Sequence, residues 1–256
     1  MDHPAYGRLR PVTATASVLL CHNPGVMTLE GTNSWVLSGP RSDELVIVDP
    51  GPDDVEHLDR LAALGQVSLV LVSHRHSDHT EGIGRFADAT GAVVRSVGPE
   101  FLHGPGGRLV DGEVIDAAGL RITVMASPGH TADSVCFLLD DAVLTADTIL
   151  GRGSAVIDDS DGSLAQYLES LQRLAGIAGR AMLPGHGPES PDVALAARGY
   201  LAHRHQRLDQ IRAALGALGA DASPRDVVEH VYAGLDGSLL DAAESSVRAQ
   251  LEYLRS

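Results

Sequence analysis

The chain has 256 residues, of which 44% are hydrophobic, and its formal net charge at pH 7 is −15. That length suffices for one large α/β domain with a small appendage, and no apolar run of about 18 residues predicts a transmembrane helix. Residues 1–10 lack the apolar core of a secretory signal and only two cysteines occur, so we expect a cytoplasmic protein with no membrane partner. All 19 basic residues are arginine, and the acidic balance argues against tight non-specific binding of nucleic acid.

The first half of the chain alternates short apolar runs with amphipathic segments. Strands are predicted at residues 18–20, 34–37 and 45–48, and a helix at 54–64, where apolar residues recur at helical spacing. Residues 67–72 are rich in Val and Leu, which is typical of a buried strand. A polar loop follows, and then a predicted helix at 83–90 and a strand at 92–97.

The second half repeats this order of strands and then helices. Strands are predicted at 114–115, 120–126, 135–139, 142–144 and 181–183, with helices at 164–175 and 193–206. Such an order predicts an α/β protein in which two packed sheets carry helices outside, a four-layer α/β/β/α sandwich over residues 1–204.

From about His205 the pattern changes to three short predicted helices, at 208–218, 223–232 and 240–254. Ser223 followed by Pro224 is typical of a helix start. Residues 205–256 are therefore predicted to be a small helical module, similar to a winged helix with a very short wing. We favour a cap that packs on the main domain over a nucleic-acid-binding unit.

The loop after the strand at 67–72 carries His74, His76, Asp78 and His79 within six residues. Imidazole and carboxylate are the ligands that divalent transition metals take from proteins, and this spacing at the end of a strand is unlikely to arise by chance. The loop alone cannot complete two metal sites, so the rest of the chain must supply further ligands.

Three further candidates also follow predicted strands: His130, Asp147 and His186. Glycine and proline precede both histidines, which suits tight turns that bring the backbone close to a site. Because each candidate follows a strand, we expect all of them to converge at one edge of the sheets.

With these residues, the chain resembles the metallo-β-lactamase-fold hydrolases from about residue 22 to its C-terminus. Within that superfamily it is most similar to the beta-lactamase-like protein 2 group. The closer similarity lies in four segments, which are NPGVMTLEGTN at 23–33, VDPGP at 48–52, ADTILG at 146–151 and LPGHGP at 183–188. Two positions depart from many relatives: Ala146, where glycine is common, and Arg75, which either orients an anionic substrate or is solvated.

The resemblance implies a binuclear metal site with two Zn²⁺ ions per chain, iron or manganese being the alternatives. It assigns His74, His76 and His130 to one ion, Asp78, His79 and His186 to the other, and Asp147 to both. Asp78 is also implied as the catalytic residue that orients the attacking water. Asp49 is expected to hydrogen-bond a ligand histidine, although it also suits a turn before Pro50.

The expected function is a binuclear zinc hydrolase that uses a metal-bridging hydroxide to cleave a small ester or thioester, similar to hydroxyacylglutathione hydrolases. One alternative is a single-strand endoribonuclease, with single-stranded RNA as the partner, and another is a mononuclear iron persulfide dioxygenase. Basic residues for a glutathione site are available at Arg204, Arg207 and Arg212. The other histidines are interpreted as surface residues (His3, His57, His203, His205, His230) or as loop residues able to face a cleft (His22, His103).

Overall fold

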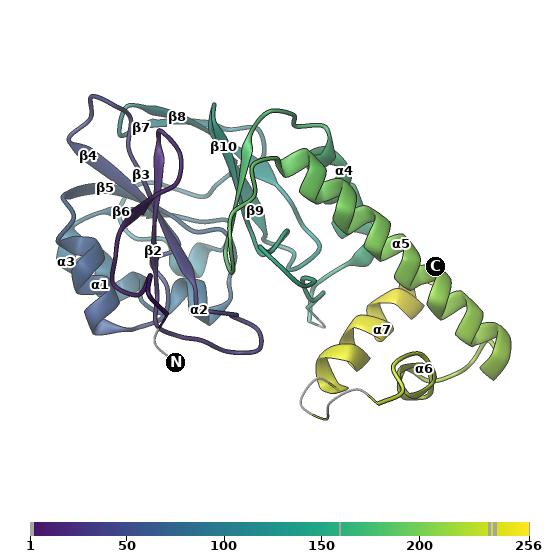
Figure 1. Ribbon diagram of the computed structural model, residues 1–256. Helices are drawn as coiled ribbons and strands as arrows, with labels where there is room; N and C mark the ends of the chain where they lie inside the picture. Colours follow the sequence, from purple (N-terminus) through teal and green to yellow (C-terminus); the bar gives the residue numbers. More distant parts are fainter. Residues whose placement is uncertain (1–2, 159, 235–236, 238–239, 256) are drawn as a thin grey trace.

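The computed structural model describes residues 3–158, 160–234, 237 and 240–255. Two β-sheets lie face to face, with helices on their outer sides (Figure 1). The first sheet contains, in spatial order, β1 (Arg10–Pro11), β2 (Ala16–Leu20), β3 (Asn33–Leu37), β4 (Glu44–Val48), β5 (Gln66–Leu71) and β6 (Val93–Arg95). The second contains β11 (Ala181–Pro184), β10 (Ala142–Ala146), β9 (Val135–Leu138), β8 (Leu120–Ala126) and β7 (Val114–Ala117).

The main hydrophobic core lies between these sheets. Trp35 and Leu37 of β3 pack there with Phe137 of β9 and Leu183 of β11, and all four side chains are buried. The Trp35 indole donates a hydrogen bond to the carbonyl of Pro184, 3.0 Å away. This contact joins the two sheets at the end of β11, close to one of the predicted ligand turns.

Helices cover the outer face of each sheet, as the four-layer prediction requires. On the first sheet lie α1 (Val55–Ala62) and α3 (Ile83–Thr90), which bury Leu58, Leu61 and Phe86 against the strands, and α2 (Ser77–Thr80) precedes α3 in the chain. On the second lie α4 (Leu164–Ala175) and α5 (Val193–Leu218), which bury Tyr167 and Leu171 among others. The short helix α2 falls in the ligand segment, which we had expected to be a loop.

The helices predicted at 193–206 and 208–218 are in fact one helix, the 26-residue α5. No glycine or proline separates the two segments, so nothing ends the helix there. Its buried face changes instead, because Val193 and Ala197 face the second sheet while Ile211 and Ala214 face the C-terminal helices. The domain boundary predicted at 204/205 therefore lies within a continuous helix.

The C-terminal module is formed by the end of α5 with α6 (Pro224–Val231) and α7 (Leu240–Arg255). Ser223 caps α6 as predicted, since its side chain accepts from the backbone of Asp226. Among the described residues after β11 there is no strand, so the described part of the module contains no counterpart of the wing. None of the helices in the described parts of the chain has the length and apolar character needed to cross a membrane.

The ligand turns lie together because the strands that precede them end at one edge of the two sheets. Backbone hydrogen bonds join these turns directly, from Asn33 N to Gly185 O, from Gly185 N to Ala146 O and from Val135 N to Ser73 O. Ala146 adopts a positive φ of 44°, a conformation that glycine adopts without strain. The glycine that the resemblance led us to expect at this position would adopt this conformation more easily.

Candidate metal centre

Three histidines and one aspartate form what we call the first cluster. His74 and His76 follow β5, His130 lies between β8 and β9, and Asp147 directly follows β10. The Nδ1 atom of His76 lies 3.0 Å from Nε2 of His74 and 3.1 Å from Nε2 of His130. The Asp147 Oδ2 atom lies 4.0 Å from the His74 Nε2 atom and 3.8 Å from the His130 Nε2 atom.

The second cluster consists of Asp78, His79 and His186. The His186 Nε2 atom lies 3.0 Å from Oδ2 of Asp78 and 3.3 Å from Nε2 of His79. Asp147 also reaches this group, since its Oδ2 atom is 3.4 Å from His186 Nε2 and its Oδ1 atom is 3.6 Å from His79 Nε2. The structure therefore brings together all seven residues predicted as ligands, with Asp147 between the two clusters.

Each of the five histidines has its outer ring nitrogen beside a hydrogen-bond acceptor. The acceptors are Ser73 Oγ for His74 (2.9 Å), Asp158 Oδ2 for His76 (2.9 Å), Asp49 Oδ2 for His79 (2.9 Å), the Val156 carbonyl for His130 and the Gly31 carbonyl for His186 (3.1 Å). Ser73 Oγ donates its own proton to Asp49, so it accepts from His74. With the outer nitrogens protonated, every ring turns a lone pair toward the centre.

The centre is consequently lined by acceptors, which is the arrangement that a cation requires. Asp147 is buried, and its Oδ1 atom has no hydrogen-bond partner among the described residues. Facing lone pairs and an unpaired buried carboxylate oxygen are costly unless a positive ion lies between them. Donor atoms bound to one tetrahedral Zn²⁺ at about 2.0–2.2 Å lie roughly 3.3 Å apart. The separations within each cluster, from 3.0 to 4.0 Å, fit such an ion.

The electrostatic field of the carboxylates acts most strongly on the second cluster. Burial opposes a charge on His186, but Asp147 and Asp78 raise the pKa of this residue to about 11. Burial likewise opposes a charge on His79, whose pKa Asp147 and Asp49 raise to about 8. In the first cluster, burial lowers the pKa of His74 well below its ordinary value. A field that favours an extra proton on His79 and His186 also favours a metal cation beside them.

The clusters open into a pocket of about 410 Å³. Apolar side chains form much of its wall, in particular Val26, Met27, Leu29, Leu150 and Val156. Val26 and Met27 are 64% and 54% exposed, although both are large apolar residues. The pocket thus combines a polar floor of metal-ligating groups with an apolar side able to receive a hydrocarbon group.

The residues expected around the ligands have more specific contacts than the sequence indicated. Asp49 accepts hydrogen bonds from His79 and from both the backbone and the hydroxyl of Ser73. Arg75, which we expected either to bind substrate or to be solvated, instead pairs with Asp158 and Asp161 at 2.9 and 2.8 Å. The sequence did not indicate that Ser73 and Asp158 hydrogen-bond the outer nitrogens of His74 and His76. A serine or an aspartate in a polar segment carries no signal of which residue it will contact.

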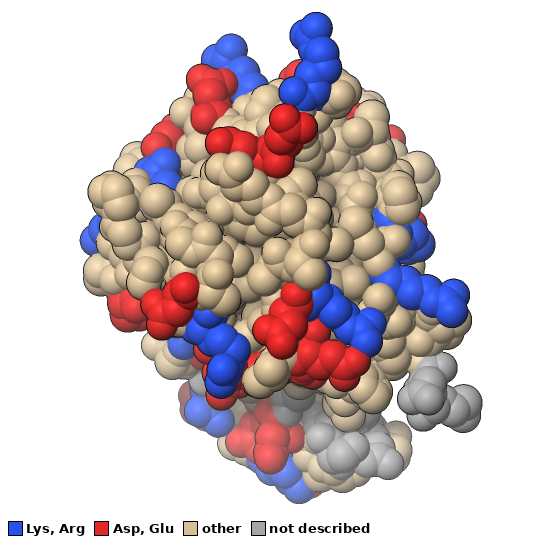
Figure 2. All heavy atoms as spheres, turned by 90° about the vertical axis from the view of Figure 1, so that its left-hand side faces the viewer, with Lys and Arg blue, Asp and Glu red and all other residues tan. Residues whose placement is uncertain are grey.

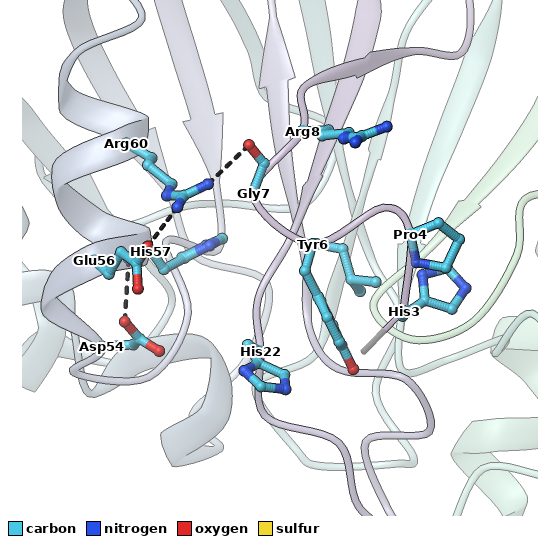
Figure 3. A pocket seen from close by; sticks show the side chains of 11 residues that line it. His3, Pro4, Tyr6, Gly7, Arg8, His22, Asp54, Glu56, His57 and Arg60 are labelled. Carbon is cyan, nitrogen blue, oxygen red and sulfur yellow. Dashed lines mark hydrogen bonds and ion pairs between the residues drawn. The ribbon is translucent and has the colours of Figure 1, made fainter. Parts of the chain in front are cut away.

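Several other histidines and arginines lie elsewhere than expected. His57, predicted at the surface, is buried, and its Nε2 atom lies 2.9 Å from the Ser34 hydroxyl. His22 faces not the metal clusters but a separate hollow of about 330 Å³, where its ring packs against Tyr6 (Figure 3). His103 pairs with Val94 of β6 through the backbone. Arg204 is only 3% exposed and is not available for a substrate on the surface.

The fold and the converging ligand groups are those of a metal-dependent hydrolase. The chain belongs to the metallo-beta-lactamase superfamily, whose model matches residues 27–186, as the motifs predicted. It is 30% identical over 226 residues to lactamase-like protein adaB of Aspergillus niger, covering 83% of this chain and 67% of that protein. It is 29% identical over 254 residues to the beta-lactamase-like protein 2 homolog of Caenorhabditis elegans, covering 92% and 82%.

A third relative is the atrochrysone carboxyl ACP thioesterase of Aspergillus fumigatus, 28% identical over 241 residues, with 86% of this chain and 74% of that protein covered. Among solved structures, a beta-lactamase domain protein from Burkholderia ambifaria superposes with a TM-score of 0.81 at 21% identity, covering 99% of this chain and 89% of that one. A metallo-beta-lactamase family protein from Thermus thermophilus gives 0.76 at 22% identity, covering 94% and 93%. These structural likenesses show the fold.

Proposed function

We propose that the protein is a binuclear zinc hydrolase that cleaves a thioester of a small molecule or a carrier-bound acyl group. The observation that carries the proposal is the sharing of one buried carboxylate, Asp147, between two clusters of inward-facing ligand atoms. A site that holds two ions in this way suits hydrolysis of an activated carbonyl. The alternative, a dioxygenase, would need only one iron ion. The similarity to a protein named as an ACP thioesterase supports a thioester as the substrate class.

The metal ions, when bound, would supply a water of lowered pKa and a positive charge for the carbonyl oxygen. The position of Asp78 supports a role in moving the proton of that water. Its Oδ2 atom belongs to the second cluster, while its side chain is 25% exposed and lines the pocket. We assign Asp78 the orientation of the attacking water and the transfer of its proton to the leaving thiolate.

The shape of the pocket indicates how the substrate would lie. The apolar side chains of Met27, Leu29 and Leu150 stand beside the clusters and would contact the acyl chain. Arg152, an arginine that lines the pocket, is already paired with Glu30. Uncharged acyl groups should therefore be preferred over acyl groups that carry a negative charge close to the carbonyl.

The test combines metal analysis with turnover on the same purified sample. Elemental analysis should find about two zinc ions per chain, as the seven ligands imply. The protein should hydrolyse thioesters of uncharged medium-length acyl groups faster than the matched oxoesters. His76→Ala and Asp78→Ala should each lose more than about 100-fold in kcat/KM, since even loss of an outer partner costs 10–100-fold. His205 is an exposed residue of α5, so the variant His205→Ala serves as the control.

Two outcomes would replace this proposal with one of the alternatives. Cleavage of single-stranded RNA without thioester turnover would identify an endoribonuclease. An RNA backbone would need a continuous basic surface. On the face shown in Figure 2, however, arginines lie beside acidic side chains and form no such surface. One iron per chain, with no hydrolysis of either substrate, would indicate a persulfide dioxygenase.

A further inference from the structure

The segment 155–158, which we call the strap, contacts the outer side of the first cluster. The Val156 carbonyl accepts from Nδ1 of His130, and the Asp158 carboxylate accepts from Nε2 of His76 at 2.9 Å. The backbone N–H of Asp158 also donates to the carbonyl of His130, 2.9 Å away. The strap therefore holds the outer nitrogens of two of the three histidines in this cluster.

The opposite side of the strap faces the C-terminal half of the molecule. Ala155 and Ile157 are buried in the core formed by α4, α5 and the second sheet, and Val156 lines the metal pocket together with Ala155. The carbonyl of Ala155 accepts from Nη2 of Arg204 in α5, and that of Ile157 accepts from the Ser245 hydroxyl of α7 at 3.3 Å. The strap thus contacts the metal centre on one side, and α5 and α7 on the other.

Arg204 is an unusual residue to find at such a position. It is 3% exposed, its guanidinium lies 4.8 Å from the ring centroid of Tyr167, and no carboxylate pairs with it among the described residues. Burying a cation without an ion pair is unfavourable, and an apolar residue of similar volume would often be tolerated or better. Its hydrogen bond to the strap gives this costly residue a role that packing alone does not.

We propose that α5 and α7 set the metal affinity of the first cluster, with Arg204 and Asp158 acting as positioning residues through the strap. The inference rests on the proposed function only in requiring a metal ion at the first cluster. The second cluster lacks this connection, because its histidines are held by Asp49 and by the carbonyl of Gly31. Loosening the strap should therefore weaken one metal site and spare the other.

The experiment compares Arg204→Met with Arg207→Met in the full chain. Arg207 lies one turn further along α5 with its guanidinium 5.6 Å from the ring centroid of Tyr232, so it has a similar stacked setting but no contact with the strap. Zinc release to a chromogenic chelator and cobalt(II) absorption titrations resolve the two sites. Arg204→Met should lower the metal affinity of one site about tenfold, which is the lower end of the range observed when a hydrogen-bond partner of a ligand is removed. Arg207→Met should leave the affinity of both sites unchanged.

A purely structural role for Arg204 would give a different result. Arg204→Met would then lower the melting temperature of the metal-free protein without changing one site selectively, and equal metal affinities in the two variants would overturn the proposal. If Arg204→Met does not fold, Ser245→Ala removes the other anchor by deleting one hydroxyl, and Asp158→Asn tests the inner end of the strap. Both should weaken the same single site, and unchanged affinity in both would also overturn it.

Metal binding is measured without any substrate, which separates this inference from the proposed function. A protein that binds two zinc ions but cleaves no thioester would refute the thioesterase proposal and leave the role of the strap open to the same comparison. A thioesterase whose two sites respond equally to Arg204→Met would keep its function and refute the strap.

Discussion

The two ligand clusters lie side by side and share Asp147, but they depend on different parts of the chain. The second cluster is supported from the N-terminal half, by Asp49 after β4 and by the carbonyl of Gly31 before β3. The first cluster is supported largely from residues 155–158, which in turn contact α5 and α7. The comparison shows that two neighbouring ligand clusters can be stabilised by separate regions, so damage to one region need not affect both sites.

The separation is not complete, because Asp49 reaches both clusters. Its carboxylate accepts from His79 directly, and from the Ser73 hydroxyl that accepts from His74. Asp49 also has a positive φ of 55°, which directs the chain into the turn before Pro50. The sequence offered two roles for Asp49, as a hydrogen-bond partner of a histidine and as a turn former. Asp49 fills both roles at once in the structure.

Gly185→Ala should produce the largest effect, because it damages the region that the clusters share. A Cβ atom at this position would lie 2.3 Å from Oδ1 of Asp147 and 2.9 Å from Cε1 of His79. Since Asp147 must move, we expect both metal sites to weaken and kcat/KM to fall by more than about 100-fold. Elemental analysis and turnover check this result. Gly199→Ala, which meets no atom within 4 Å, is the control and should retain full activity.

Asp49→Asn should have the next largest effect and distinguishes the two regions. An amide in place of the carboxylate cannot accept from both His79 and Ser73 as well as from the Ser73 backbone, so the second cluster should lose about 10–100-fold in metal affinity. The site held by the strap should lose less, since it is reached only through Ser73. A chelator competition that resolves two sites measures both, and an equal loss at both would show that the clusters behave as one unit.

The convergence of the predicted ligand residues at one edge of the sheets could be predicted from the sequence, whereas the groups that hold them could not. His74, His130, Asp147 and His186 each follow an apolar strand, and parallel or antiparallel strands of two packed sheets bring such turns to a common edge. The four layers follow from the same alternation of strands and helices. These predictions depend on patterns that are local in the chain.

The outer partners depend on contacts between distant residues, and no local pattern marks them. His76 and Asp158 are 82 residues apart, and the Val156 and Gly31 carbonyls carry no side-chain signal at all. For Arg204 the local pattern was misleading, since a charged residue on an amphipathic helix is usually exposed. The prediction that α5 was two helices failed for a related reason, because a change of buried face resembles a break in periodicity.

His57 gives the N-terminal half a sensitivity to acid that does not involve the metal. Burial, opposed by Asp54, lowers the pKa of His57 to about 4. The unfolded chain takes up the proton below about pH 6.5 while the folded chain does not, so stability is present above that pH and is lost as the pH falls toward 4. Between pH 7 and pH 5 this group should cost the metal-free protein about 2 kcal/mol.

Urea unfolding of the metal-free protein at both pH values measures this loss. His57→Gln keeps a polar group beside the Ser34 hydroxyl but cannot titrate, so the variant should lose about 2 kcal/mol less than the native protein between pH 7 and pH 5. The difference between the two proteins cancels the contribution of the other histidines. Equal losses would mean that His57 takes up a proton while folded.

Ala146→Gly should have the smallest effect, and it concerns the residue that precedes the shared aspartate. Ala146 has a φ of 44°, and this conformation costs an L-residue about 1–2 kcal/mol in the folded state. Glycine removes that strain but lowers the free energy of unfolding by about 0.4–1 kcal/mol, because the unfolded chain gains conformational freedom. The balance predicts a gain of roughly 0.5 kcal/mol in unfolding free energy, with both metal sites unchanged because no ligand atom moves. A lower metal affinity in this variant would show that the strained turn, rather than the outer partners of the histidines, holds Asp147 between the two clusters.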